Sequence, residues 1–183
     1  MAKAAEAYAG ERYVEARRIL RPIAAEVPGA ASVHELLGLV HYRLGKWREA
    51  IGSLETFRTL TGSTEQHPVL ADCYRAQKKF VAVAELWAEL GEASPSPELM
   101  VEGRLVAAGA LADQGRLADA LRLLGKGWRP PSNPHPYHLR RAYGLAALQE
   151  RVGDLPAARA TFQWVQSIDP EFVDVSARID ALS

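Results

Sequence analysis

One pattern recurs five times along the chain and limits what it can fold into. Each copy has a turn, a large apolar residue, a small residue three positions later and another large residue four positions beyond that. In the clearest copy Trp47, Ala50, Leu54 and Phe57 stand three or four residues apart, so a helix places them on one face. The large residues that follow the five turns are separated by 34, 33, 37 and 38 positions: Tyr13, Trp47, Phe80, Leu117 and Leu155. The pattern predicts an all-α chain of helix-turn-helix repeats.

The small residue of each copy allows the two helices of a repeat to approach closely. It is alanine in four copies and Val83 in the third (Ala16, Ala50, Ala120 and Ala158). The two longer steps coincide with clusters of proline and serine at residues 94–97 and 130–134, where insertions into a turn are expected. The chain therefore reads as one repeated structural unit with two loop insertions.

The 34-residue period, the small residue, the pairs Leu37-Gly38 and Leu70-Ala71, and a proline closing several copies resemble the tetratricopeptide repeat (TPR). The resemblance covers nearly the whole chain. It implies a right-handed α-solenoid of about five antiparallel helix pairs in one array over residues 1–183, with repeats at 1–29, 31–62, 64–96, 97–132 and 135–170. Residues 171–182 are expected to form a C-terminal capping helix, because the last repeat otherwise exposes its apolar face.

Charge and composition exclude several classes of protein. The 22 basic side chains balance the 22 acidic ones, and no local patch stands out, so we expect neither nucleic acid nor an anionic membrane as partner. No stretch reaches the ~18 apolar residues of a membrane span, and the first residues do not resemble a signal peptide. The single cysteine, Cys73, cannot form an internal disulfide. We expect a cytoplasmic protein without membrane insertion.

Few residues suggest chemistry. His34 and His41 are about 10 Å apart along a helix, too far to bind one metal directly, and they occupy packing positions of the repeat. His135 and His138 read as a loop and a helix start. Cys73 has no base nearby in sequence and reads as a buried small residue. We therefore expect no catalytic residue, no metal and no cofactor, and predict that the protein is not an enzyme.

The resemblance also implies a binding surface, because the first helices of TPR proteins line a concave groove that receives peptides or helices. Tyrosine is favoured as an interface anchor, and arginine can grip carboxylates or carbonyl groups. The leading hypothesis is a non-catalytic adaptor or scaffold for a protein or peptide. The alternative is that these are only solvated helix faces. Carried over to this chain, the expected inward-facing residues are Glu35, Leu39, Tyr42, Arg43, Asp72, Arg75, Arg140, Tyr143 and Arg151.

A second hypothesis is a self-associating structural subunit. The first helix is expected to be only about eight residues long, Ala2 to Ala9, below the mean of about 11. So short a helix is expected to expose the apolar face from Tyr13 to Ile23, and such an edge favours a homodimer through the N-terminal end of the array. The short helix also leaves open whether the natural chain begins before Met1.

Overall fold

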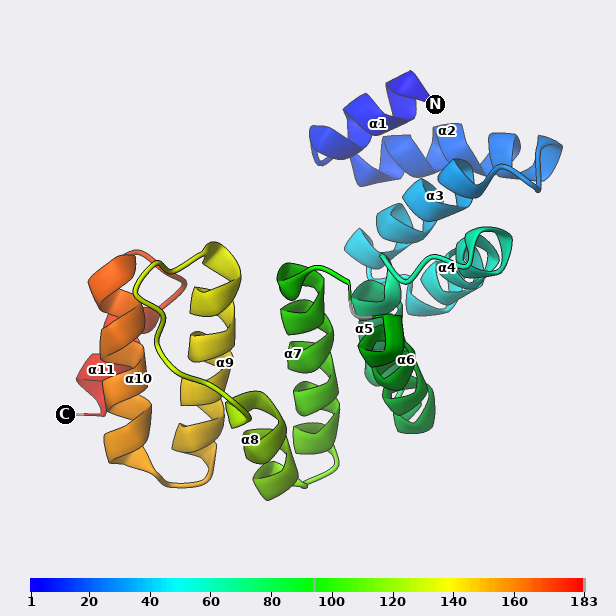
Figure 1. Cartoon of the computed structure of the whole chain (residues 1–183). Coiled ribbons are helices and arrows are strands. Elements are labelled where there is room, and N and C mark those ends of the chain that lie inside the picture. The colour runs from blue at the N-terminus through cyan, green and yellow to red at the C-terminus, as the bar shows by residue number, and fades with distance from the viewer. Residues whose placement is uncertain (94, 183) are drawn as a thin grey trace. The chain divides into compact units, whose positions relative to one another are not determined.

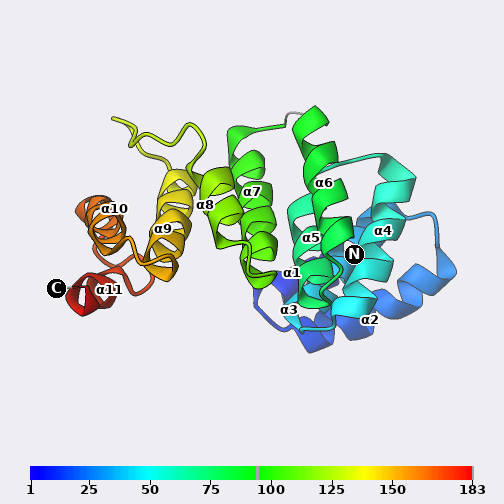
Figure 2. The same ribbon diagram turned by 90° about the horizontal axis from the view of Figure 1, so that it is seen from below.

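A computed structural model describes residues 1–93 and 95–182, and every regular element in those two ranges is an α-helix. The all-α prediction is therefore confirmed. Within each repeat the two helices run antiparallel and pack against each other (Figures 1 and 2). In chain order the helices are α1 (Ala2–Ala9), α2 (Tyr13–Glu26), α3 (Ala31–Arg43), α4 (Trp47–Thr61), α5 (His67–Ala76), α6 (Phe80–Ala93), α7 (Pro97–Asp113), α8 (Leu117–Gly125), α9 (Pro136–Arg151), α10 (Leu155–Ile168) and α11 (Val175–Ala181).

The five turns inside the repeats share one conformation. The residue two positions before each large apolar residue has a positive φ: Glu11, Gly45, Lys78, Gly115 and Gly153. The amide of the next residue donates to the carbonyl oxygen five positions earlier, at 2.8–2.9 Å in all five turns. This is the hydrogen bond of the Schellman motif, which closes a helix on a left-handed residue. At Glu11 and Lys78 a residue with a side chain adopts the conformation that glycine adopts freely.

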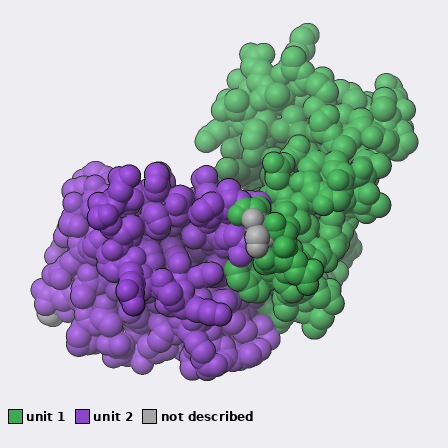
Figure 3. Space-filling view, in the orientation of Figure 1, with its two compact units in different colours: residues 1–95 green, residues 96–183 purple. Residues whose placement is uncertain are grey.

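The chain divides into two compact units, residues 1–95 and 96–183, coloured separately in Figure 3. The division falls at the first predicted insertion, of which Ser94 lies outside the described residues. Unit 1 contains α1 to α6, and unit 2 contains α7 to α11. A single array over residues 1–183 stays a prediction.

In unit 1 the small residues lie where the helices of a pair meet. Ala16 and Ala50 have no exposed surface, and Val83 is also buried. Gly38 of α3 makes a still closer approach, since a Cβ atom added there would lie 2.6 Å from the Leu54 side chain of α4. The predicted role of these residues, close contact between paired helices, is therefore confirmed.

One expectation about unit 1 is wrong. The face of α2 from Tyr13 to Ile23 is not an exposed edge, because α1 packs on it despite its eight residues. Ala16 and Leu20 are completely buried in a core that also holds Ala4 and Ala7 of α1. Two alanines facing α2 let α1 lie close enough to cover it.

Unit 2 has two clusters of buried side chains. One is centred on Leu124 and Leu145 where α7, α8 and α9 meet, and the other on Phe162 where α9, α10 and α11 meet. The last helix covers α10 as predicted of a cap, with Val175 and Ile179 buried. It begins at Val175 rather than at residue 171, because the chain turns at Val173, which has a positive φ.

Candidate functional site

The predicted binding residues lie on α3 and α5 of unit 1 and on α9 of unit 2, all first helices of their repeats. We call the side of these helices that carries them the first-helix face of each unit. On both faces most of these side chains form hydrogen bonds to the next or previous first helix, or to the residue just before the capping helix. The joined pairs are 30, 31, 38 or 39 residues apart.

On the first-helix face of unit 1, three predicted residues meet. The Tyr42 hydroxyl of α3 donates to Asp72 Oδ2 of α5 at 2.9 Å, and Arg75 pairs with the same carboxylate at 3.5 Å. The Tyr42 ring packs edge-on against Trp47, with centroids 5.5 Å apart. Burial, followed by the charge of Asp72, raises the pKa of Tyr42 to about 12. Tyr42 therefore links two repeats as a hydrogen-bond donor.

The other predicted residues of unit 1 are more varied. Glu35 accepts a hydrogen bond from Gln66 Nε2 at 2.9 Å, just before α5. Leu39 is half-buried, whereas Arg43 is exposed at the end of α3. The nearby Tyr8 hydroxyl raises the pKa of Arg43, so the guanidinium lies near α1. Arg43 is therefore an exposed cation on the side of this face next to α1.

In unit 2 the arginines of α9 are held by α7. Arg140 Nη2 donates to Glu102 Oε2 at 2.7 Å, while 57% of the Arg140 side chain stays exposed. Arg151 is exposed as well, and its Nη2 donates to the Ala112 carbonyl oxygen at 3.4 Å. Burial raises the pKa of Glu102, although the charge of Arg140 opposes that effect. Both arginines present cationic groups whose direction a neighbouring helix restricts.

Tyr143 lies at the capped end of unit 2. Its hydroxyl donates to the Asp174 carboxylate just before α11, and its ring contacts Phe162 and Phe172 at centroid distances of 5.4 and 5.8 Å. Burial, then the hydrogen bond to Asp174, raises the pKa of Tyr143 to about 12. Tyr143 therefore links α9 to the segment that leads into the capping helix.

Several partners of these residues were not foreseen from the sequence. Gln66, Glu102 and Asp174 complete contacts that fix the first-helix faces. A usable signal was present: a polar residue stands 30 or 31 positions after Glu35, Tyr42 and Tyr143, close to one repeat. Such spacing identifies neighbours on successive first helices.

The side chains considered above for chemistry, Cys73 and the histidines, are buried or engaged in local contacts. Burial raises the pKa of the Cys73 thiol to about 12, which suppresses the thiolate that a nucleophile requires. His41 is buried, and His135 and His138 form a capping box at the start of α9. Among residues 1–93 and 95–182, no three His, Cys, Asp or Glu side chains gather closely enough to hold a metal ion.

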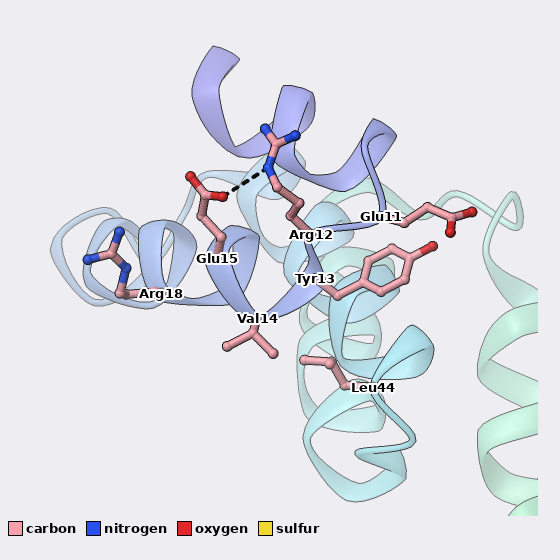
Figure 4. A pocket seen from close by; sticks show the side chains of 7 residues that line it. All are labelled: Glu11, Arg12, Tyr13, Val14, Glu15, Arg18 and Leu44. Atoms are coloured by element: carbon pink, nitrogen blue, oxygen red, sulfur yellow. Dashed lines mark hydrogen bonds and ion pairs between the residues drawn. The ribbon is translucent and has the colours of Figure 1, made fainter.

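A shallow depression of about 580 Å³ lies at the turn between α1 and α2. Figure 4 shows Tyr13, Val14 and Leu44 along it, with Arg12 and Glu15 joined by an ion pair of 2.9 Å. Val14 is 61% exposed. The apolar surface left at this end of unit 1 is therefore centred on Val14. Within the described residues, no helix combines the length and the apolar content needed to cross a bilayer.

No protein-family model matches the sequence, and no curated protein matches it either. Solved structures do match. A thermophilic TPR protein of Thermus thermophilus aligns with a TM-score of 0.72 at 18% identity, over 100% of this chain and 96% of that chain. The C-terminal part of a TPR repeat-containing protein of Cytophaga hutchinsonii gives 0.72 at 13% identity, over 98% and 69%.

A third structure contains the nearly identical TPR-like repeats of a Podospora anserina protein assigned as a kinesin light chain. It aligns with a TM-score of 0.67 at 19% identity, over 92% of both chains. At sequence identities of 13–19% the three matches are evidence about the fold alone. They confirm the resemblance found in the repeat pattern. The chain therefore has the α-solenoid fold of the tetratricopeptide-repeat proteins.

Proposed function

We propose that the protein is a non-catalytic scaffold that binds a protein or peptide segment along its first-helix faces. The observation that carries the proposal is the exposure and the position of Arg43, Arg140 and Arg151. All three are exposed, and Arg140 and Arg151 also donate hydrogen bonds to groups of α7, while Arg43 lies near Tyr8 of α1. A cation that is already oriented loses less side-chain entropy when it grips a carboxylate or carbonyl group. Leu39 and the ring of Tyr42 supply half-buried apolar surface on the same face of unit 1.

Cys73 is buried with a raised pKa, and the buried imidazole of His67 is bonded to Glu89 at 2.9 Å, so neither is presented to a substrate. We place the protein in the cytoplasm, with protein partners rather than nucleic acid or membrane lipid. Fractionation of the native cell tests the location.

The test is a cross-linking capture from the native cell with two matched triple variants. Arg43→Ala, Arg140→Ala and Arg151→Ala together should abolish a partner that the unmodified chain captures. The control carries Arg18→Ala, Arg21→Ala and Arg48→Ala, which remove the same charge from exposed positions on second helices. Equal capture by both variants would place the binding surface elsewhere.

A second candidate function is self-association through the N-terminal end of unit 1. It is supported by the depression beside the exposed Val14 rather than by the Tyr13–Ile23 face, most of which packs against α1 and α3. If two copies pair there, Val14→Glu should convert a dimer to a monomer in sedimentation equilibrium. Val81→Glu is the control, since Val81 of α6 is also exposed. A monomeric mass for the unmodified chain at high concentration would rule this function out.

A further inference from the structure

Unit 2 contains a long segment with charge of one sign. Residues 120–149 include five Arg or Lys side chains and two histidines but no Asp or Glu, although the whole chain has zero net charge. Helix α10, which packs against α9, contributes Arg159 and no acidic residue. Carboxylates outside the segment pair with two of these cations, Arg122 with Asp119 and Arg140 with Glu102. The remaining cations, Lys126, Arg129 and Arg141, form a local excess of positive charge that the balanced total for the whole chain does not reveal.

The folded structure keeps this positive charge uncancelled at Arg141. Arg141 Nε donates to the Leu124 carbonyl oxygen at 3.0 Å, and Nη2 donates to the Lys126 carbonyl oxygen at 2.7 Å. Arg104 of α7 donates to the same Lys126 oxygen at 3.3 Å. Carbonyl oxygens satisfy the N–H groups without removing a unit of charge. Burial, then the nearby charge of Arg104, lowers the pKa of Arg141 to about 10.

An apolar cavity lies next to this charge. It has a volume of about 270 Å³ and is lined by Trp128, Pro130, Ala160, Thr161 and Trp164. The two indole rings meet edge to face, with centroids 5.4 Å apart, and the Arg141 guanidinium lies 5.4 Å from the Trp128 ring. The Thr161 hydroxyl is already bonded to Gln149 and to the backbone of Ala157. The cavity therefore offers aromatic surface with cations at its edge.

The size and walls of the cavity restrict its occupant. Sites for whole small molecules measure about 300–1,000 Å³, so this cavity suits one large side chain. Nucleic-acid bases need open aromatic faces to stack on. Here Arg141 lies over the Trp128 ring, and Trp164 meets that ring edge to face. A peptide side chain therefore fits this cavity better than a nucleic-acid base does.

We propose that this surface, which we call the Trp128 pocket, binds an acidic extended peptide of a partner protein. A bulky apolar side chain of the peptide enters the cavity and packs against the wall formed by Trp128, Pro130 and Trp164. The flanking carboxylates of the peptide face Lys126, Arg129 and Arg141. The residues differ from those of the first-helix faces, so the inference does not depend on the proposed function.

The test uses fluorescence anisotropy with the full chain and labelled synthetic peptides. The probe is EEEWEEE, and the comparison peptides are EEEGEEE, which lacks the large side chain, and KKKWKKK, which reverses the charge. A labelled single-stranded thymidine oligomer is the nucleic-acid arm. We expect EEEWEEE to bind, EEEGEEE to bind several-fold more weakly, and KKKWKKK not to bind.

Two variants locate the site without touching buried residues. Lys126→Ser with Arg129→Ser should weaken EEEWEEE about fivefold, the scale of two exposed charge pairs. Lys3→Ser with Arg48→Ser removes the same charge from exposed positions in unit 1 and should change nothing. Ala160→Glu, at an exposed position of α10, should abolish binding by placing a carboxylate in the cavity.

For Ala160→Glu the matched control is Ala84→Glu, at an exposed position of α6. Circular dichroism is used to check that every variant keeps its helices. The proposal is overturned if no peptide binds at about 1 mM, if the control variants weaken EEEWEEE as much as the pocket variants do, or if EEEGEEE binds as well as EEEWEEE. It is also overturned if the thymidine oligomer binds more tightly than EEEWEEE, which would mark a nucleic-acid surface.

Discussion

Arg58 in unit 1 and Arg141 in unit 2 hold neighbouring repeats together with the same chemical group but with different partners. Arg58 of α4 bonds both oxygens of Glu89 of α6, at 2.6 and 2.7 Å, and Glu55 at 3.1 Å. The network extends to Tyr74 through Glu55 and to the buried His67 through Glu89. Arg141 instead bonds two carbonyl oxygens at the end of α8.

The difference shows that packing and surface charge can be set separately in a repeat protein. A carboxylate partner fixes a guanidinium and cancels its charge. A carbonyl partner at a helix C-terminus also fixes it and interacts favourably with the helix dipole, but leaves the charge in place. Unit 1 uses the first solution at Arg58 and unit 2 the second at Arg141, where the surrounding sequence is free of acidic residues.

The largest effect is expected from Arg141→Met. Two carbonyl oxygens at the end of α8 lose charged donors, and the Trp128 ring loses its cation. The free energy of unfolding of unit 2 should fall by about 2–3 kcal/mol. Hydrogen exchange of the α8 amides at increasing urea concentration measures it. Arg140→Met, whose side chain is largely exposed, should cost under about 1 kcal/mol. Equal losses would show that the carbonyl contacts are unimportant.

Arg58→Met should have a smaller and salt-dependent effect. The network around Glu89 is part-exposed, so we expect a loss of about 1–2 kcal/mol in unit 1 at low ionic strength. In about 1 M NaCl the loss should shrink, because screening already weakens the ion pairs of the unmodified protein. The loss in Arg141→Met should change little with salt. The same salt response in both variants would contradict the distinction between the two kinds of partner.

Substitutions in two of the turns should change the stability of their units in opposite directions. Lys78→Gly should raise the stability of unit 1 by about 1 kcal/mol, because glycine adopts the left-handed conformation without the steric cost of a Cβ atom. Gly115→Ala should lower the stability of unit 2 by about the same amount. Thermal unfolding followed by circular dichroism measures both, with Lys79→Gly as a control one residue away. A loss of stability in Lys78→Gly would contradict the assigned turn.

The smallest effect concerns the pKa values of Glu89 and Glu102, which should be shifted in opposite directions from the ordinary value of 4.5. Burial tends to raise the pKa of Glu89, but His67 and Arg58 lower it overall, whereas burial raises the pKa of Glu102. Glu89 therefore stabilises unit 1 above pH 4.5, and this is lost as the pH falls through its folded pKa.

For Glu102 the sign reverses. Its raised pKa favours the protonated form in the folded state, so its contribution is fully present below pH 4.5 and is lost as the pH rises through its folded pKa. Carboxyl titrations by NMR, with Glu89→Gln and Glu102→Gln to assign the resonances, measure both values. Shifts of the same sign would mean that Glu102 is governed by Arg140 rather than by burial.

Much of the fold was predictable because the repeat pattern follows from helix geometry. The small residues and the glycine turns at Gly45, Gly115 and Gly153 are visible in the sequence. The turns at Glu11 and Lys78 carry no such mark, since the helices on either side impose the conformation. The burial of the α2 face does not follow from the length of α1, because it depends on how closely Ala4 and Ala7 let α1 approach α2.

The candidate site was less predictable. Spacing placed Tyr42 and Tyr143 on first helices, but their hydrogen bonds to Asp72 and Asp174 depend on how successive helices meet. The Trp128 pocket brings together a loop and α10, which are about 30 residues apart in sequence. The binding roles of these residues stay predictions.

The buried Cys73 gives this protein a built-in reporter of local unfolding. It is the single thiol of the chain, and in the folded state it is fully covered on α5 with its pKa raised to about 12. Alkylation at neutral pH therefore proceeds through the open form, in which the thiol regains its ordinary reactivity. The ratio of the alkylation rates of folded and unfolded chains gives the equilibrium constant for opening α5. The middle of unit 1 can thus be followed in a cell extract without adding a probe to the sequence.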